Sequence, residues 1–279
     1  MIFLIAHDSI RALLHRRLLW GLMVATLAAT LAFSAMFSSF KGNMNESFMD
    51  QYGYDLKGSD LKGSSPKEGK SRISEKDRRE MRAQMEMASS GFQTFFYVVA
   101  SFGGSLVALF IFSDAVSSEI RKGTIRLTLS KPVSRAQFLL GKYLGGVAVM
   151  AGYALLASAA MLAFAYSQEF ELSPAMKFAP WLMFCRQLML GSVAMLLSLF
   201  VHPLVAAVIA FFAGNGFYSH YNPLFYILPS YGEFDLWGEV FSGSLLRASD
   251  VGFLTLYAAD FVAIMLLLAI WRFRYKELI

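Results

Sequence analysis

The sequence contains little cysteine and few charged residues. Its 279 residues include one cysteine, Cys185, which lies inside an apolar run. A single cysteine excludes an internal disulfide bond. Charged residues make up 16% of the chain, well below the ~25% that is typical of soluble domains. The composition therefore excludes an ordinary soluble globular protein.

Motifs for nucleotide and metal binding are also missing from the sequence. No G-x-x-x-x-G-K-[ST] loop occurs, so any ATP hydrolysis, with its Mg²⁺, must come from another chain. The histidines show neither the H-E-x-x-H pattern nor clustered ligand spacing; they are His7, His15, His202 and His220. We expect no metal site, no catalytic residue and no cofactor bound by this chain. The net charge of +5 requires no nucleic-acid partner, because the cations gather where membrane topology places them.

Long apolar runs dominate the rest of the chain, and 56% of the residues are hydrophobic. A helix of ~20 apolar residues crosses a hydrocarbon core of ~30 Å, and lipid offers the backbone no other hydrogen-bond partners. We predict an all-α polytopic membrane protein with a single transmembrane domain over residues 1–279. Its six expected spans are 18–37, 92–112, 138–166, 181–201, a run that begins at 204, and 251–271.

Residues 1–17 have the pattern of an amphipathic helix that lies at the membrane surface. The apolar side is expected to hold Phe3, Ala6, Ile10, Leu13 and Leu14, and the polar side His7, Asp8, Arg11 and His15. The alternative is a secretory signal peptide with its apolar core at 18–33, but no A-x-A cleavage site follows. We therefore expect an uncleaved first span.

Residues 38–90 form a polar insert between the first two spans. A doubled DLKGS sequence at 55–59 and 60–64 is typical of a flexible linker, although it could also be a binding element. Ser74 and Asp77 then resemble a capping box, and we predict a short separate helix at 74–89. The size of this insert indicates either an external protein partner or a gate there.

Small residues and helix breakers mark two further features of the spans. The Gly103-Gly104 pair and the Gly141/Gly145 spacing would allow helices to approach closely. Residues 218–250 contain several aromatic residues, prolines and polar side chains, and we expect short broken helices there. His202-Pro203 is expected to form a tight turn between the fourth and fifth apolar runs.

The distribution of cations predicts the orientation of the chain. Lysine and arginine cluster at the N-terminus, around residues 121–142 and at 272–276, whereas the segments 167–180 and 218–250 are mainly acidic. By the positive-inside rule, both termini and the 113–137 loop face the cytoplasm, across a plasma (inner) membrane.

The segment 117–142 carries more local structural signals than any other loop. Ser117, Ser118 and Glu119 could start a helix, and Gly123 could stop it in the left-handed conformation. This pattern predicts a helix of one or two turns across the cytoplasmic face. The alternative is an ordinary solvated loop whose positive charge follows from the positive-inside rule and has no docking role.

A second set of signals in this segment fixes the entry to the third span. Lys131-Pro132 breaks the chain, and Ser134 with Gln137 forms an S-x-x-Q capping box. Val133 and Phe138 occupy the positions of a hydrophobic staple. The combined signals favour a firmly directed docking element over a random loop.

Three short sequences in this segment resemble the signature of type-2 ATP-binding-cassette (ABC) permeases: EIRKGTI at 119–125, SKPVSR at 130–135 and GKYL at 141–144. The resemblance implies that a coupling helix docks on a separate ABC ATPase subunit, and that the permease is a dimer, here expected to be a homodimer. The coupling residues would be Glu119, Ile120, Arg121, Lys122, Gly123 and Thr124. The residues that shape the loop would be Pro132, Ser134, Arg135 and Gln137.

Three charged residues lie inside or beside the expected spans. Asp260 lies near the middle of the sixth span, where a carboxylate costs about 2.5–3.5 kcal/mol; it could line a substrate path or form a structural hydrogen bond. Arg186 is expected to snorkel toward the membrane surface, or else to line such a path. Asp114 could be a membrane-edge residue or a brace for the coupling loop.

We therefore expect a membrane permease subunit of an ABC exporter that moves a substrate when a partner ATPase hydrolyses ATP. One alternative is a membrane assembly or signalling subunit that recruits a partner through residues 38–90 and transports nothing. An intramembrane enzyme would need clustered polar residues on facing spans, and the sequence offers only Asp260 and Arg186.

Overall fold

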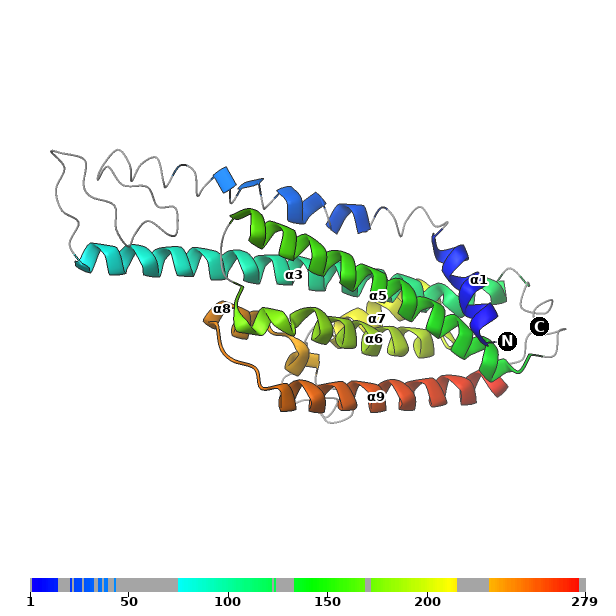
Figure 1. Cartoon of the computed structure of the whole chain (residues 1–279). Helices are drawn as coiled ribbons and strands as arrows, with labels where there is room; N and C mark the ends of the chain where they lie inside the picture. Colours follow the sequence, from blue (N-terminus) through cyan, green and yellow to red (C-terminus); the bar gives the residue numbers. More distant parts are fainter. Residues whose placement is uncertain are drawn as a thin grey trace.

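A computed structural model describes residues 2–14, 21, 23–26, 28–32, 35–36, 38–39, 43, 75–121, 123, 133–168, 172–214 and 231–275. Within these residues every regular element is helical, which confirms the predicted all-α fold (Figure 1). The elements are α1 (Ile2–Leu14), α3 (Glu75–Arg121), α5 (Arg135–Gln168), η2 (Pro174–Lys177), α6 (Ala179–Ser198), α7 (Pro203–Gly214), η4 (Tyr231–Phe234), α8 (Trp237–Ser242) and α9 (Ala248–Tyr275).

Four helical segments are long and apolar enough to cross a membrane: Glu86–Arg121, Arg135–Ser167, Ala179–Ser198 and Ala248–Tyr275. They correspond to the second, third, fourth and sixth predicted spans. The expected fifth span is α7, whose 12 residues cover about 18 Å at ~1.5 Å per residue. Much of the first predicted span, and the stretch that follows α7, lie outside the described residues.

Helix α3 corrects the prediction of a separate helix at 74–89. It runs without a break through 47 residues, a length of about 70 Å, and Figure 1 shows its first turns extending beyond the rest of the bundle. The segment 75–90 is rich in Glu, Lys, Arg, Met, Gln and Ala, all of which favour helix. The change from polar to apolar composition therefore marks no break in the backbone. The doubled DLKGS sequence and Ser74 lie outside the described residues.

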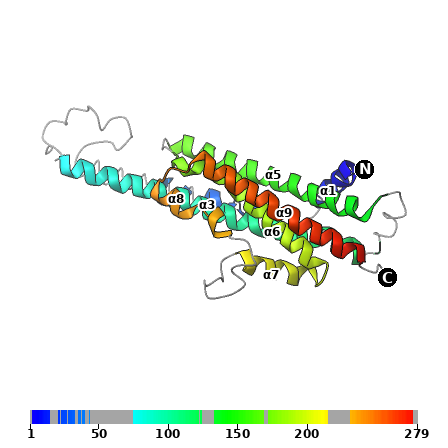
Figure 2. The same ribbon diagram turned by 90° about the horizontal axis from the view of Figure 1, so that it is seen from below.

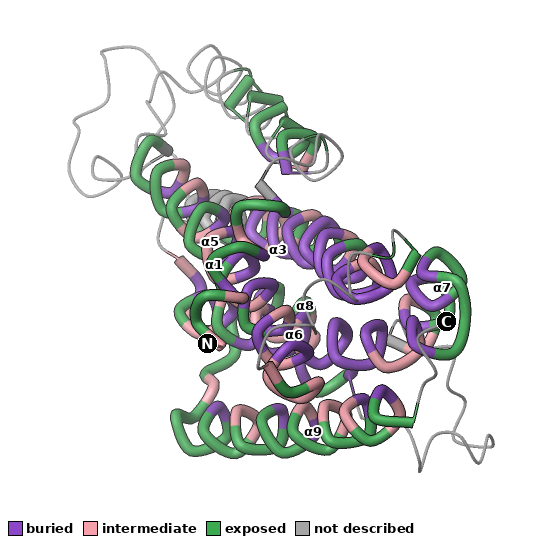
Figure 3. The backbone as a smooth tube through the Cα atoms, turned by 90° about the vertical axis from the view of Figure 1, so that its right-hand side faces the viewer, coloured by how far each residue is buried: buried purple, intermediate pink, exposed green. Residues whose placement is uncertain are grey.

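Helix α6 lies at the centre of the bundle and packs against α3, α5, α7 and α9. It buries polar as well as apolar side chains, among them Arg186, Gln187 and Ser192. Figure 3 shows the contrast with α9, which is exposed along much of its length. The exposed side chains of α9 are mainly apolar, as expected of a helix that faces lipid or a second protein chain.

Glycines allow the close contacts between these helices, as the sequence predicted. A Cβ atom on Gly104 of α3 would overlap Gln187 of α6, and one on Gly191 of α6 would overlap the ring of Phe112. Gly141 and Gly145 of α5 both face α1, where they meet Ile5 and Ser9. This glycine pair therefore packs helices within one chain.

Helix α1 packs against the bundle through one side only. Its buried side chains are Ala6, Ser9 and Leu13, whereas Phe3 is 84% exposed. Ile5 and Ser9 of α1 fit against the glycines of α5, and this contact places Phe3 outward because it lies on a different side of the helix. The amphipathic helix forms, but its packed face is not centred on Phe3.

The described part of the 218–250 segment consists of short helices, as predicted. η4 and α8 have 4 and 6 residues, and α8 ends at Gly243, whose φ of 66° is left-handed. We call the end of the bundle that contains η2, η4 and α8 the α8 end. The opposite end contains the end of α3, the start of α5, the α6–α7 turn and the end of α9, and we call it the basic end.

Candidate functional site

Helix α1, the C-terminal ends of α3 and α9, and the start of α5 lie together at the basic end (Figures 1 and 2). Several arginines lie here, namely Arg11, Arg121, Arg135, Arg272 and Arg274. The interactions of this end decide whether the coupling segment is a loose loop or a braced surface.

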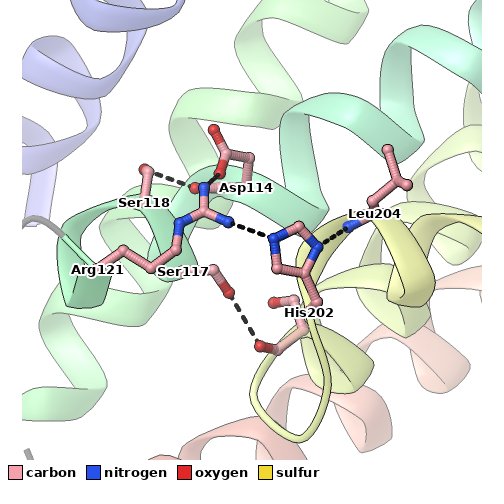
Figure 4. Close-up of polar contacts among 7 residues, drawn as sticks. Asp114, Ser117, Ser118, Arg121, His202 and Leu204 are labelled. Carbon is pink, nitrogen blue, oxygen red and sulfur yellow. Dashed lines mark hydrogen bonds and ion pairs between the residues drawn. The ribbon is translucent and has the colours of Figure 1, made fainter.

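A polar chain links the end of α3 to the α6–α7 turn (Figure 4). Arg121 donates to the carboxylate of Asp114 at 2.8 Å, and its other terminal nitrogen lies 3.2 Å from Nε2 of His202. Nδ1 of His202 faces the backbone N–H of Leu204 at 3.3 Å. A neutral imidazole accepts at only one nitrogen, so Arg121 and Leu204 compete for the lone pair of one ring. Asp114 therefore pairs with the last residue of its own helix; its role as a membrane-edge residue or as a brace for the coupling loop stays a prediction, because residues 124–132 lie outside the described residues.

The serines at 117 and 118 explain why no new helix begins there. Ser117 donates its hydroxyl to the carbonyl of Ser198 at 2.9 Å, and Ser118 donates to the carbonyl of Asp114 at 2.7 Å. Both hydroxyls therefore bond carbonyl groups, and neither caps a free N–H at a helix start. The predicted separate coupling helix is wrong: residues 117–121 are the last turn of α3.

Gly123 ends this region as predicted. Its φ of 69° is left-handed, a conformation that glycine adopts without the steric cost of a side chain. Its N–H bonds the carbonyl of Ile120 at 3.2 Å, which satisfies one of the free carbonyls at the end of α3. Lys122, Thr124 and Pro132 lie outside the described residues.

An ion pair joins the end of α3 to the start of α5. The carboxylate of Glu119 contacts the ammonium of Lys142, and both side chains are largely buried. The same ammonium lies 5.7 Å from the centre of the Phe138 ring. The first and last parts of the sequence signature are thus in direct contact.

The start of α5 has the predicted capping box. The N–H of Ser134 donates to the side chain of Gln137 at 3.0 Å, and the N–H of Gln137 donates to the Ser134 hydroxyl at 3.2 Å. Phe138 is fully buried, and Val133 packs against the same core. These reciprocal bonds direct the chain into α5.

Arg135 makes a contact that sequence reasoning missed. One of its terminal nitrogens donates to the carbonyls of Phe273 and Arg274, each at 3.0 Å. These carbonyls belong to the last turn of α9, where a cation is favourable. Arg272 of the same turn lies 4.8 Å from the ring of Phe200 in the α6–α7 turn. The basic end therefore connects α3, α5, α6, α7 and α9.

Arg186 does not snorkel toward the membrane surface. It is 6% exposed, donates to the hydroxyl of Ser101 on α3 at 3.0 Å and lies 3.9 Å from the carboxylate of Asp235. Burial raises the pKa of Asp235, because its loss of hydration outweighs the charge of Arg186, and Glu239 adds to the increase. The guanidinium of Arg186 lies between the helices because Ser101 and Asp235 interact with it there.

Tyr97 extends this polar cluster to the segment between η4 and α8. Its hydroxyl donates to the carbonyl of Phe234 at 3.0 Å and accepts from the N–H of Leu236 at 3.2 Å. Polar residues on facing helices are thus more numerous than the sequence indicated. The hydrogen bonds of Arg186 and Tyr97 join residues more than 80 positions apart, which no local pattern could reveal.

Asp260 lies on an exposed part of α9. Within the described part of the chain, its carboxylate forms no hydrogen bond or ion pair. The structural hydrogen bond to a neighbouring helix, one of the two interpretations of this residue, is therefore not found in the described protomer. Asp260 and Arg186 are not brought together.

The family model described as "ABC-2 family transporter protein" matches residues 3–214, which is more than half of the chain. The chain belongs to the ABC-2 transporter family. This confirms the resemblance found in the sequence and identifies a multi-pass membrane permease component of an ABC transporter. A search of curated protein sequences found no match to this ABC-2 chain. The matched region includes the predicted coupling segment and ends before η4, α8 and α9.

Proposed function

We propose that this ABC-2 protein is the permease subunit of an exporter whose ATPase is a separate chain, which carries the ATP and Mg²⁺. The observation that supports this most is the set of contacts at the end of α3. Glu119 joins it to α5, while Ser117 and Arg121 join it to the α6–α7 turn. A force on this turn of α3 would therefore act on the bundle and not on a loose loop.

The proposed mechanism uses α3 as a lever. The docking surface consists of the last turn of α3 and Gly123, with Lys122 and Thr124 expected to continue it. When the ATPase subunits close on ATP, they would push this surface along the bundle. The 47-residue length of α3 would carry the movement to the α8 end, because its ladder of backbone hydrogen bonds is unbroken from Glu75 to Arg121.

The orientation and the oligomeric state belong to the same proposal. We propose that the protein lies in the plasma membrane. By the positive-inside rule, the basic end and both termini would then face the cytoplasm. Asp260 supports a second copy of the chain, because a carboxylate exposed to lipid costs about 2.5–3.5 kcal/mol on insertion scales. We propose that a homodimer covers this part of α9, where Asp260 would lie beside the substrate path.

Gly123 provides a sharp test of the docking role. In Gly123→Pro the ring fixes φ near −65°, so the left-handed turn and the N–H bond to Ile120 are both lost. Gly243→Pro is the matched control, because Gly243 has a similar φ of 66° and its N–H also bonds a helix carbonyl, but at the α8 end. The measurements are co-purification with the ATPase and the ATPase rate in proteoliposomes.

We expect Gly123→Pro to reduce ATPase binding and its stimulation by at least about tenfold, or ~1.4 kcal/mol. Gly243→Pro should leave both near the wild-type value. Full binding and full stimulation in a folded Gly123→Pro protein would rule out the docking role.

The projecting start of α3 favours an additional role for residues 38–90 (Figure 1). We propose that this region binds an external protein, with or without transport of a substrate. Deletion of residues 42–70 separates the two possibilities: unchanged substrate flux with lost partner recruitment would indicate an assembly role, and lost flux would indicate a part in transport.

A further inference from the structure

A cavity of about 630 Å³ lies between α3, α5 and α6 toward the α8 end. Its volume is within the ~300–1,000 Å³ of typical ligand sites. The wall consists mainly of small and apolar side chains, including Phe96, Ala154, Met161 and Phe184. A wall of this kind fits a hydrocarbon chain.

The divergence of α5 from α6 produces this cavity. Toward the basic end the two helices are close, because Tyr143 donates to the carbonyl of Leu188 at 3.1 Å, and the Phe112 ring fits beside both Gly146 and Gly191. Toward the α8 end they separate, as Figure 1 shows. Leu155 and Leu162, both on the cavity wall, are also exposed on the surface of α5. The cavity therefore opens sideways between α5 and α6.

The length of the cavity corresponds to one leaflet of a bilayer. Its lining on α5 extends from Ala151 to Leu162, which is about 17 Å at ~1.5 Å per residue. Half of a ~30 Å hydrocarbon core is about 15 Å. An acyl chain that entered from the side would fill the cavity without crossing the middle of the membrane.

The lining of the cavity ends in one cation and one tryptophan, Lys177 and Trp181. Lys177, at the end of η2, is exposed, and no acidic side chain in the described part of the chain pairs with it. Trp181 lies one helical turn further and donates its indole N–H to Thr255 at 2.9 Å. Tryptophan is enriched at membrane interfaces, and lysine near the surface attracts anionic headgroups.

We propose that this cavity binds one acyl chain of an anionic phospholipid from the leaflet at the α8 end, with its phosphate beside Lys177. The assignment to the outer leaflet rests on the proposed orientation of the exporter. The bound acyl chain would contact α3 at Phe96 and Ala100. Lipid binding could therefore affect the position of α3, the helix that carries the proposed docking surface.

The test uses the full chain in nanodiscs without an ATPase. Two photoreactive lipids with a diazirine on the same acyl chain are compared, phosphatidylglycerol and phosphatidylcholine, and the labelled peptides are identified by mass spectrometry. We expect labelling concentrated on residues 151–162 and 179–184, with phosphatidylglycerol favoured about fivefold, as one lysine near the surface would give.

Two pairs of variants separate the cavity from its mouth. Ala154→Phe fills the cavity and should remove most of the labelling, whereas Ala159→Phe, on the exposed side of the same helix, should not. Lys177→Gln should abolish the preference for phosphatidylglycerol, whereas Arg247→Gln, an exposed cation at the same end, should preserve it.

Uniform labelling along the exposed faces of α5 and α9 would overturn the proposal, because it would show only surrounding lipid. Equal labelling by both lipids would overturn the role of Lys177. Since the ATPase is absent, these outcomes do not depend on whether the docking surface works as proposed.

Discussion

Glu119 and Lys142 form an ion pair that ties the last turn of α3 to the first turns of α5. The residues lie on either side of the segment expected to meet the ATPase, so this contact sets how the two helices move together. The two side chains are 12% and 21% exposed, so removal of one partner should cost less than the ~3–5 kcal/mol of breaking a fully buried pair. We expect Glu119→Gln or Lys142→Met to lower the free energy of unfolding by about 1–3 kcal/mol.

A double-mutant cycle measures this pair directly. If the side chains interact, the double variant should lose less stability than the sum of the single variants, with an interaction energy of about 0.5–3 kcal/mol. The exchanged pair, Glu119→Lys with Lys142→Glu, should recover part of the loss. Thermal unfolding in detergent provides the comparison, and simple additivity would contradict the proposed link between α3 and α5.

Arg121 is expected to matter for coupling more than for stability. Its side chain is 48% exposed, and ion pairs at exposed positions contribute only about 0–1 kcal/mol. Arg121→Ala should therefore change the unfolding temperature little. It should still lower the stimulation of the ATPase, because the link from α3 to His202 is lost.

Arg274→Ala is a suitable control for Arg121→Ala, since this arginine is also exposed at the basic end. Equal losses of ATPase stimulation in both variants would indicate a general effect of positive charge. A loss confined to Arg121→Ala would indicate a role specific to Arg121, either in the docking surface or in the link to the α6–α7 turn, and the same loss in His202→Ala would identify the link.

Arg135 should stabilise the last turn of α9. Arg135→Ala removes the donor to the carbonyls of Phe273 and Arg274, so hydrogen exchange in the last turn of α9 should accelerate. Arg135→Lys keeps the charge but not the planar donor group, and it should give an intermediate rate. Mass spectrometry of peptides from residues 268–275 is the measurement, and an unchanged rate in Arg135→Ala would contradict this role.

The features that the sequence predicted well are those with local causes. The Ser134–Gln137 capping box spans four residues, and the left-handed Gly123 depends on its own backbone, so both could be derived before any tertiary contact was known. The break predicted before residue 92 was wrong, because strong helix formers continue α3 through the change in polarity. Arg135 and Arg186 find their partners on other helices, and only the packed bundle reveals them.

Gly191 provides a test of the packing between α6 and α3. A Cβ at this position would overlap the Phe112 ring, and Phe112 is fully buried, so the ring has little room to move. We expect Gly191→Ala to lower the free energy of unfolding by about 1–3 kcal/mol, as is usual for overpacking.

Gly91→Ala is the matched control for this test, because it makes the same substitution within a helix. No atom lies within 4 Å of a Cβ at Gly91, so alanine should be neutral or stabilise α3 by about 0.5–1 kcal/mol. The measurement is thermal unfolding of both variants in the same detergent, and the two changes in stability are expected to have opposite signs. A Gly191→Ala protein as stable as the wild type would mean that α6 can move away from Phe112, and the close approach of α3 and α6 would then not be a fixed feature of the bundle.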